Sequence, residues 1–595
     1  MLKRKHIDCD LCVVGGGMSG MMAAIAAARE GVKVVLMHER PVLGGNASSE
    51  IRMWICGAAD RDNRETGILE EIALENLYRN PTKSFAIWDT VLYDFVKREE
   101  NITLLLNCTC MDAETEEGEF KYGRTGKIKS VTGYQMTTQC FYEVSAKYFC
   151  DSSGDSILAP LCKAEFRIGR EAKSEFNEDT SIVEADKMTM GMSCLIQGRE
   201  TTKDIKFIPP EYVAGIPDEV FENRTPSIYN ESENYWYLEL GGDRNTIEDT
   251  EEIRDELVVL ATRMWDFIKN SGKIDADKWD LDFLGFLPGK RESRRMCGEY
   301  MITQRDIGDN VVFDDEIAYG GWPIDDHFPG GFYNKGSVNT SRWTCSPYSI
   351  PYRALYSKNI ENLFFAGRNI SMTHMAMSSM RVMATCSLLG EAVGKAAAVA
   401  TKNGYTPHDV YLDGKDMLQT LLLNEDCFLP SKMRKVSELC RNSELNIESE
   451  VIRNGQDRQH RLYDTDETNF AYSASKNEQI SYSFEPSQIE SVHIVFDSDI
   501  NRDTLPGGHC ERIHSTRANH LLDSPQMCMP KTLCKEFKLI GELDGEKTEL
   551  MHVTNNRKRA YHLNVNKKFD KLTLIPIDIW DDDAENVNIV SFDFI

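Results

Sequence analysis

The sequence predicts a mixed α/β protein with a nucleotide-binding domain, an inserted α+β substrate domain and a separate C-terminal β-sandwich. Near the N-terminus, an apolar strand pattern meets closely spaced glycines and an alanine-rich helix. After residue 360, a second strand ends in a glycine and leads into a helix, and beyond residue 460 short alternating strands prevail. We therefore expect the nucleotide-binding domain at 1–162 and 346–435, the insert at 163–345, a polar linker at 436–459 and the sandwich at 460–595.

The first glycines follow directly on a strand pattern. Leu11–Val14 is apolar, and glycines then stand at Gly15, Gly17 and Gly20, where a helix opens. In such a turn the first glycine permits a tight bend, and the second lets the backbone approach a pyrophosphate. The third allows helix and strand to pack closely, and the helix N-terminus faces the anion.

A second strand and an acidic residue complete this unit. Val32–Met37 is apolar, and Glu39 follows about 20 positions after Gly20, where a carboxylate would hold a ribose hydroxyl. Strand, glycines, helix, strand and acid in this order predict a Rossmann-like dinucleotide site rather than a βαβ unit without a ligand.

The residues after Glu39 favour FAD over NAD. Arg40 and the pair Gly44-Gly45 continue the motif as E-R-x-x-x-G-G, which resembles the flavoprotein pattern. A second glycine pair allows the backbone to pass beside the pyrophosphate and the flavin edge. The side chains that follow and could contact FAD are Asn46, Ser48 and Arg52.

Two later segments extend the same resemblance. Tyr148–Asp155 resembles the strand with Gly-Asp that closes an FAD domain, and Asn362–Arg368 resembles the C-terminal FAD motif. A long helix running to Ala400 would point its N-terminus at the flavin edge that becomes negative on reduction. The predicted FAD-binding residues are Gly15, Gly17, Met18, Ser19, Gly20, Glu39, Arg40, Gly44, Gly45, Asn46, Ser48, Arg52, Gly154, Asp155, Gly367, Arg368 and Val382.

Length and charge narrow the class of protein. A chain of 595 residues exceeds what one core normally supports, so more than one domain is expected. With 95 acidic and 68 basic residues, the net charge of −27 argues against nucleic-acid partners. The sequence contains no apolar run of about 18 residues, so we expect no membrane span. The 17 cysteines follow no disulfide framework, which favours the cytoplasm.

Regular elements can be placed along the chain, but a metal site cannot. Amphipathic patterns predict helices at 65–78, 87–99 and 251–270, and alternating patterns predict sandwich strands at 491–496, 534–540 and 572–577. Cys9 and Cys12 form a C-x-x-C, but Cys12 belongs to the apolar first strand and no second pair follows at metal spacing. We predict no metal, although Asp497, Asp499 and Asn501 offer alternating oxygen ligands and leave calcium as a minor alternative, since the residues that follow do not complete an EF-hand loop.

Four segments together resemble one family: 43–54, 288–300, 350–356 and 366–374. They are similar to the FAD-dependent oxidoreductase family of bacterial genomes, which is related in topology to the glutathione-reductase and fumarate-reductase flavoproteins. The resemblance covers about residues 8–430 and implies FAD and redox chemistry, without naming a substrate. The final sandwich more loosely resembles a galactose-binding, discoidin-type jelly roll, which favours a sugar-like substrate by analogy only.

Charged residues in the segments that would face the flavin are the candidate catalytic groups. His374 stands shortly before the flavin-facing helix and is the preferred base for removing a hydroxyl proton. Arg291 and Arg294 could hold a carboxylate or supply a proton, while Arg295 and Glu292 fit a salt bridge better. Arg353 could clamp substrate or bind flavin. His327 is a further polar candidate.

Three functions remain open on the sequence. The preferred hypothesis is a flavin dehydrogenase or oxidase that takes hydride from a small, hydroxylated or carbohydrate-derived substrate, with His374 as base. The alternative is a fumarate-reductase-like enzyme that reduces the alkene of an unsaturated carboxylate, with the arginine cluster of 291–295 holding the carboxylate or giving the proton. A flavin-containing carbohydrate-binding protein is the third. The substrate, the direction of the reaction, the electron partner and the oligomeric state do not follow from the sequence.

Overall fold

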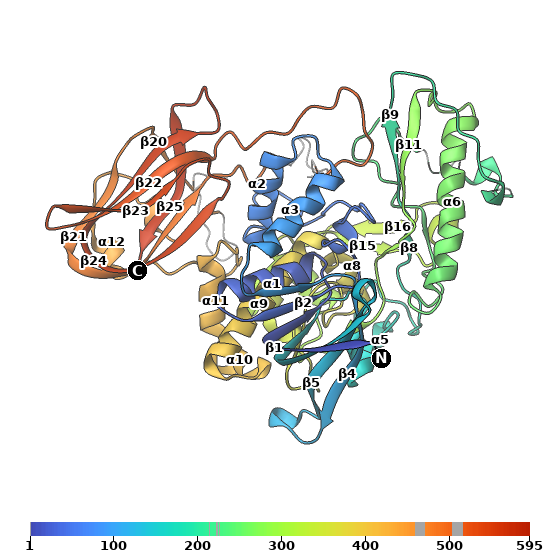
Figure 1. Ribbon diagram of the computed structural model, residues 1–595, viewed down its shortest axis with the longest axis horizontal. Helices are drawn as coiled ribbons and strands as arrows, with labels where there is room; N and C mark the ends of the chain where they lie inside the picture. Colours follow the sequence, from blue (N-terminus) through green and yellow to red (C-terminus); the bar gives the residue numbers. More distant parts are fainter. Residues whose placement is uncertain are drawn as a thin grey trace. The chain divides into compact units, whose positions relative to one another are not determined.

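The computed structural model describes residues 2–213, 215–221, 224, 226–458, 470–502, 514 and 516–595. They form two compact units, and each draws on distant parts of the chain (Figure 1). The first unit comprises Met1–Ala59, Thr82–Lys415 and Ile513–Gln526. The second comprises Asp60–Pro81, Asp416–Arg512 and Met527–Ile595.

The first unit is built on a mostly parallel sheet. Strands β3 (Ile102–Leu105), β2 (Val34–Met37), β1 (Lys3–Val14) and β6 (Cys140–Asp151) lie side by side and run parallel. The end of β6 pairs in parallel with β18 (Leu363–Phe365), and its beginning pairs antiparallel with β5 (Gly126–Gln135), which leads to β4 (Cys108–Glu117). This sheet confirms the predicted α/β fold.

The parallel strands end in one row. Val14 lies opposite both Met37 and Asp151, and Phe365 also lies opposite Asp151. The segments that follow these strands therefore leave from the same edge of the sheet. In α/β folds this carboxyl edge is where nucleotides bind.

Helices α1 (Met18–Arg29), α3 (Phe85–Lys97) and α9 (Met383–Asn403) complete the nucleotide fold. The single long helix expected to lead to Ala400 is wrong, because it is two helices that meet at 96°. Val382 is extended (φ −66°, ψ 144°) and separates α8 (His374–Met380) from α9. Among the described residues no single helix is long and apolar enough to span a membrane. Only the bent pair of α8 and α9, counted together, has the length and composition of a membrane span.

The insert packs short strands around one long helix. In α6 (Thr250–Asn270), Ile253, Leu257, Leu260, Met264 and Ile268 lie on one face and are buried, which confirms the amphipathic pattern predicted at 251–270. The short strands form antiparallel pairs or triplets. They are β7 (Phe166–Arg167) with β13 (Arg295–Met296), β9 (Ile196–Glu200) with β11 (Trp279–Leu284), β14 (Glu316–Gly320) with β17 (Tyr348–Pro351), β15 (Ile324–His327) with β16 (Asn339–Arg342), and β8 (Met192–Ser193) between β10 (Glu239–Leu240) and β12 (Gly289–Lys290).

The second unit is the antiparallel β-sandwich. Long strands β21 (Ile480–Phe496) and β24 (Ala560–Ile579) pair with one another, and the predicted strands at 491–496, 534–540 and 572–577 all fall within strands. The remaining strands are β19 (Glu444–Leu445), β20 (Tyr472–Ser475), β22 (Cys534–Leu543), β23 (Glu546–Val553) and β25 (Asn586–Phe594).

The second unit also contains chain that we expected elsewhere. Helix α2 (Ile68–Arg79) forms where the pattern predicts a helix, but its Leu74 and Leu77 belong to the core of the sandwich. In the predicted linker, α12 (Glu438–Asn442), β19 and a 3₁₀ turn at Val451–Arg453 fold into the same unit. Residues 459–469 lie outside the described part of the chain.

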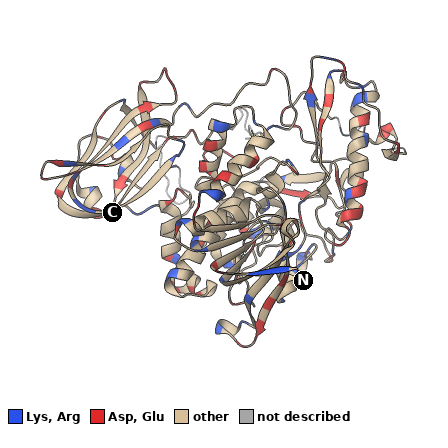
Figure 2. Ribbon diagram, in the orientation of Figure 1, with Lys and Arg blue, Asp and Glu red and all other residues tan. Residues whose placement is uncertain are grey.

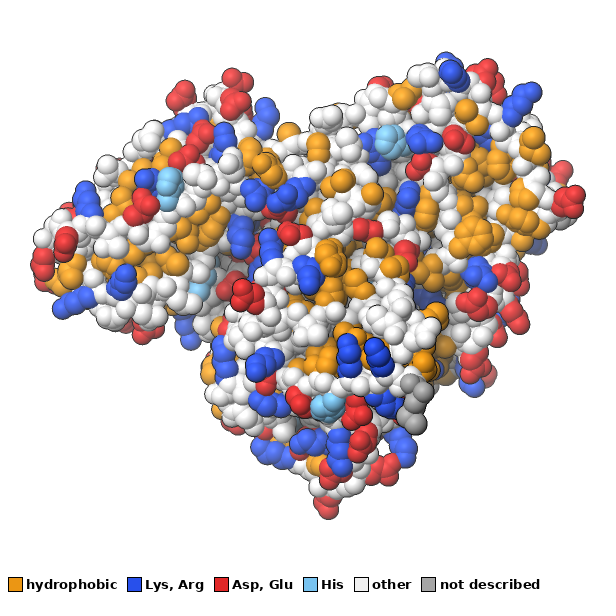
Figure 3. All heavy atoms as spheres, in the orientation of Figure 1, with side chains coloured by type: hydrophobic (Ala, Val, Ile, Leu, Met, Phe, Trp, Pro, Cys, Tyr) orange, Lys and Arg blue, Asp and Glu red, His pale blue; other side chains and the backbone are white. Residues whose placement is uncertain are grey.

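Side chains of both signs are mixed over the surface. In Figure 2, basic and acidic residues alternate along α6 and across the sandwich strands. On the face drawn in Figure 3, hydrophobic side chains lie in patches that charged side chains separate. The charge distribution in these views therefore offers no continuous basic stripe.

Candidate functional site

The first glycine turn is shaped by two contacts within the protein. A Cβ on Gly15 (φ +106°) would lie 2.3 Å from the carbonyl oxygen of Ser152, and one on Gly20 would lie 1.9 Å from the carbonyl oxygen of Gly15. A Cβ on Gly17, in contrast, would meet only the Cα of Gly45, at 3.7 Å. Space is therefore left in front of Gly17, at the start of α1, where a phosphate would approach the backbone.

The second glycine pair runs beside this turn. The Gly44 N–H donates to the Gly16 carbonyl at 2.9 Å, and Gly44 and Gly45 have φ angles of +103° and +62° that favour glycine. The Arg40 guanidinium donates to the Gly45 carbonyl at 3.4 Å. The two glycine segments that sequence reasoning assigned to FAD thus form one surface.

His38 supports this surface and was missed by the sequence reasoning. Its Nδ1 accepts the Gly16 N–H at 3.0 Å, and its Nε2–H donates to the Val42 carbonyl at 3.0 Å. Glu39 follows two residues after β2, and its carboxylate lies 3.2 Å from His38 and 3.5 Å from Arg40; 44% of its side chain is exposed, so the carboxylate can also reach a ribose. The sequence shows a histidine directly before Glu39, which could have indicated a role at this site. Only the fold shows that the His38 ring faces the glycine turn.

Asp155 joins the insert to the nucleotide fold. Its carboxylate accepts hydrogen bonds from Arg368 (2.7 Å), Lys290 (2.8 Å) and Ser293 (2.7 Å). Burial opposes ionisation, but the charges of Arg368 and Lys290 hold the pKa of Asp155 below its usual range. Gly154 has φ +78°, and a Cβ there would lie 2.2 Å from the Arg368 guanidinium. Asp155 therefore positions Arg368 and Lys290.

Unpaired polar atoms lie along the segments predicted to bind FAD. Ser19 Oγ, Arg368 Nε and Thr385 Oγ1 are buried and have no hydrogen-bond partner among the described residues, and the same is true of Asn369 Oδ1. A Cβ on Gly367 would lie 3.3 Å from Asn369 Oδ1 and 3.4 Å from Ser19 Oγ, which places these groups together. Buried polar groups normally have partners, so this set fits a polar ligand such as FAD.

The remaining residues predicted for FAD are already engaged or buried in protein. Asn46 donates to the Lys290 carbonyl at 3.2 Å, and Ser48 is fully buried. Arg52 donates to Gln197 at 2.8 Å and lies over the Phe283 ring at 4.1 Å. Met18 is buried in the first turn of α1, and Val382 forms the N-cap of α9.

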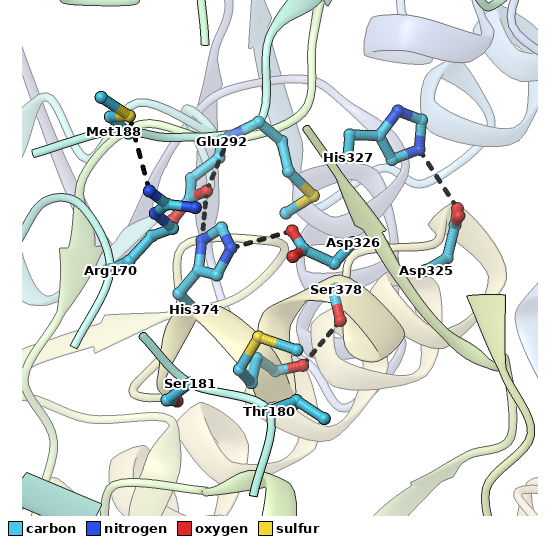
Figure 4. A network of polar contacts seen from close by, with 12 residues as sticks. Arg170, Thr180, Ser181, Met188, Glu292, Asp325, Asp326, His327, His374 and Ser378 are labelled. Atoms are coloured by element: carbon cyan, nitrogen blue, oxygen red, sulfur yellow. Dashed lines mark hydrogen bonds and ion pairs between the residues drawn. The ribbon is translucent and has the colours of Figure 1, made fainter. Parts of the chain in front are cut away.

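His374 is held between two carboxylates (Figure 4). Its Nδ1 lies 2.8 Å from Glu292 Oε2, and its Nε2 lies 3.0 Å from Asp326 Oδ1. The ring is buried, with only 2% of the side chain exposed, and it stands at the first position of α8. Asp326 comes from β15 and keeps 19% of its side chain exposed.

This pairing fixes the charge of the ring. Burial alone would lower the pKa of His374, but the negative charge of Glu292 and the hydrogen bonds to both carboxylates raise that pKa to about 10. The imidazole is then protonated at neutral pH. A protonated ring cannot accept a hydroxyl proton, so the geometry does not favour His374 as the free base that the sequence suggested.

The candidate arginines are all bound within the protein. Arg291 contacts Ser193 Oγ (2.9 Å), the Trp236 carbonyl (2.8 Å) and Glu239 (3.4 Å). Arg294 donates to the Asp155 carbonyl at 3.2 Å. Arg295 bridges Glu171 and Glu292, as the salt-bridge interpretation expected.

Arg353 belongs to a different cluster. It pairs with the buried Asp315 through Nε (2.8 Å) and Nη2 (2.9 Å), and its guanidinium lies over the rings of Tyr300 and Tyr411. The structure gives it no contact with His374 or with the glycine turns.

A second histidine has the same arrangement as His374. His327 Nδ1 lies 2.5 Å from Glu239 Oε2, and its Nε2 lies 3.3 Å from Asp325 Oδ2. Arg381, at the end of α8, donates to the same Asp325 oxygen at 3.0 Å. Asp325 thus binds His327, and its neighbour Asp326 binds His374. The two acids can do so because neighbouring side chains on a strand point to opposite faces. Among the described residues no group of three or more His, Cys, Asp or Glu side chains could hold a metal ion.

Comparison with known proteins agrees with the glycine turns. The matching family is described as FAD dependent oxidoreductase, and it matches residues 10–422. Curated relatives include fumarate reductase (cytochrome) of Shewanella frigidimarina, 50% identical over 42 residues. The match covers 7% of each chain, so this protein spans only a small part of that relative's length.

Solved structures show more distant likeness. The p-nitrophenol 4-monooxygenase of Pseudomonas putida is 11% identical, with a TM-score of 0.32, over 70% of this chain and 86% of that chain. A family 32 carbohydrate-binding module from Streptococcus pneumoniae is 10% identical, with a TM-score of 0.18, over 27% of this chain and 99% of that chain. Because the family match spans more than half of the chain, this protein belongs to the FAD dependent oxidoreductase family and binds FAD.

Proposed function

We propose that this flavoenzyme exchanges hydride between FAD and a small, uncharged, hydroxyl-bearing substrate such as a polyol or sugar, and that Asp326 carries the hydroxyl proton. FAD supplies the redox chemistry by taking up or releasing the hydride equivalent. The observation that carries the proposal is the pairing of Asp326 with a protonated His374. We place the activity in the cytoplasm on the cysteine usage of the sequence.

Asp326 is the accessible member of this group. Oδ1 is bound to His374, while Oδ2 accepts no hydrogen bond from the described residues, and 19% of the side chain is exposed. Glu292, in contrast, is fully buried and accepts the Met190 N–H at 3.0 Å. A substrate hydroxyl can therefore reach Asp326 more readily than Glu292 or His374.

The imidazolium of His374 is a positioning group in this proposal. Two carboxylates that lack a counter-charge would be costly to bury together, and the ring supplies that charge between them. It also orients the Asp326 carboxylate by a direct hydrogen bond at 3.0 Å. Burial opposes ionisation of Asp326, but His374 holds its pKa below the usual range, so this carboxylate is charged at neutral pH.

An uncharged substrate is favoured because two of the candidate guanidinium groups, those of Arg291 and Arg295, are paired with buried glutamates. Binding a carboxylate bidentately needs a guanidinium edge that is available. Arg291 and Arg295 are both paired with buried glutamates, and Arg294 donates to a backbone carbonyl. This weakens the case for an unsaturated carboxylate held by the 291–295 cluster.

Alkene reduction stays the second candidate for one reason. With a pKa of about 10, His374 holds a proton that a reduction could use. In that case Asp326 would relay the proton to the substrate, and another group would have to bind the substrate carboxylate.

The test compares two substrate sets with the purified FAD-loaded protein under anaerobic conditions. Neutral polyols, aldoses and glycosides should bleach the flavin absorbance band, and Asp326→Asn should slow this step by about a hundredfold. A matched control, Asp309→Asn, changes an exposed acid in a salt bridge with Arg305 and should leave the rate unchanged. The proposal fails if only unsaturated acids reoxidise the photoreduced flavin, or if Asp326→Asn reacts at the normal rate.

A further inference from the structure

We propose that Arg381 is the fixed positive charge beside the pyrimidine edge of the bound flavin, and that Asp325 and His327 hold its guanidinium in place. The inference concerns the cofactor and needs no substrate, so it stands independently of the hydride acceptor or donor proposed above. Two-electron reduction with uptake of one proton leaves that edge of the flavin negatively charged. A nearby guanidinium would stabilise the charge.

The packing of two helices places the start of α9 near the cofactor. A Cβ on Gly390 would lie 2.0 Å from the Ser19 carbonyl, and one on Gly394 would lie 2.4 Å from the Ala23 carbonyl. The backbones of α9 and α1 are therefore in direct contact close to the pyrophosphate turn. Because Gly390 faces Ser19 and Gly394 faces Ala23, the two helices run in the same direction, and at about 1.5 Å per residue α9 begins roughly 10 Å before Gly390, beyond the start of α1.

Unpaired polar atoms mark this end of α9. Thr385 lies in the first turn and is fully buried, yet its hydroxyl has no partner among the described residues. A threonine or serine inside a helix commonly donates to the carbonyl one turn earlier, as Ser387 does to Met383 at 2.8 Å. Arg381 Nε is likewise buried and unpaired. Both groups are available to a ligand at this position.

The guanidinium of Arg381 is held from one side only. Nη2 donates to the Asp325 carboxylate (3.0 Å) and to the Asp325 carbonyl (3.2 Å), and 13% of the side chain is exposed. Asp325 is itself fixed by His327 at 3.3 Å and by Asn339 at 2.6 Å. The cation is thus fixed in position while Nε has no partner within the described chain.

A purely structural role is the alternative, in which Arg381 only neutralises Asp325. The two roles predict different effects of replacing Arg381 on the redox equilibrium of the flavin. A structural cation changes stability when it is replaced, whereas a cation beside the flavin changes the equilibrium between its oxidised and reduced forms.

The experiment measures the midpoint potential of bound FAD in the full-length protein by equilibration with redox dyes. Arg381→Gln should lower the equilibrium constant for reduction about tenfold or more, which is about 30 mV for two electrons. Arg381→Lys should keep most of the wild-type value. The control Arg244→Gln removes a partly buried arginine that is paired with Glu256 and should change nothing. Equal potentials in Arg381→Gln and the wild type overturn the inference.

The wild-type protein offers a second measurement that does not depend on a variant folding. If the reduced flavin is held as the anion, its potential should fall by about 30 mV per pH unit from about pH 5 to 6.5, because one proton accompanies two electrons. A slope of about 59 mV per pH unit over that range means that two protons are taken up, and it overturns the inference as well.

Discussion

The glycine turn at Gly15–Gly20 and the group formed by His374 with its two carboxylates lie in the same unit. They depend on the sequence in different ways. Gly15, Gly17 and Gly20 stand within one short segment, and the demands on each come from its neighbours in the βαβ unit. His374 meets Glu292 and Asp326 across 82 and 48 positions of the chain. The first site follows from local backbone geometry, while the second exists only after the insert has folded against the nucleotide domain.

The largest effect should come from breaking the local site. Gly17→Val places a branched side chain where phosphate oxygens would sit, so the purified protein should be colourless and contain no FAD. Gly308→Val is the control, because a Cβ at Gly308 meets nothing within 4 Å. FAD content is measured by absorbance after denaturation. Stoichiometric FAD in the Gly17 variant would contradict the placement of the pyrophosphate in front of Gly17.

Removing the C-terminal part should have the next largest effect. The sequence predicted a linker at 436–459 followed by a separate sandwich, but 513–526 belongs to the first unit and α2 to the second. In that segment Asn519 is buried and accepts the Gly198 N–H at 2.9 Å. Truncation after Ser437 also exposes Leu74 and Leu77 of α2.

We therefore expect the truncated chain to aggregate or to lose FAD on gel filtration, with the full-length protein as the reference. The truncated protein could instead be monomeric and yellow, with its flavin reduced at the normal rate. That result would show that the first unit needs neither the segment 513–526 nor a covered α2.

Breaking the non-local site should cost stability in a pH-dependent way. His374→Gln removes the buried cation between Glu292 and Asp326 and leaves Glu292 with Arg295 as its remaining charged partner, at a cost of about 3–5 kcal/mol near pH 6. The pKa of His374 in the folded protein, about 10, lies above the ordinary histidine pKa of about 6.5, so this stability is present below pH 6.5 and is lost as pH rises through about 10.

The difference in unfolding free energy between wild type and variant should therefore shrink from pH 6 to pH 10, as measured by urea titration. A difference that stays constant across this range would mean that the ring is neutral in the folded protein.

The smallest effect is expected at Arg353. Arg353→Gln leaves the buried Asp315 without its charged partner, which should cost about 1–3 kcal/mol of unfolding free energy. Flavin reduction should change by less than about twofold, because Arg353 contacts neither the glycine turns nor the His374 group. A large loss of rate in stopped-flow measurements, with stability intact, would restore the catalytic role that the sequence suggested.

The sequence predicted what depends on neighbouring residues. The glycine turns, α6 and the sandwich strands follow from local spacing, and so does the existence of α2. Local spacing does not predict which core α2 packs against, because the same apolar face of the helix could be buried in either core. The break before α9 was also missed, since Val382 is apolar and continues the helical pattern although its backbone is extended.

The same limit applies to the chemistry. A histidine near a flavin-facing helix predicts a base with an ordinary pKa, and only the fold reveals the two carboxylates that keep His374 protonated. Asp326 gave no local signal beyond a pair of adjacent acids before His327.

The pH dependence of flavin reduction tests the central claim most directly. With a reactive neutral substrate, the rate of flavin bleaching in stopped flow should vary by less than about twofold from pH 5 to pH 9. The reason is that Asp326 is already ionised and His374 already protonated over this range. A rate that rises about tenfold per pH unit up to an inflection near 6.5 would instead identify a histidine base and contradict the account.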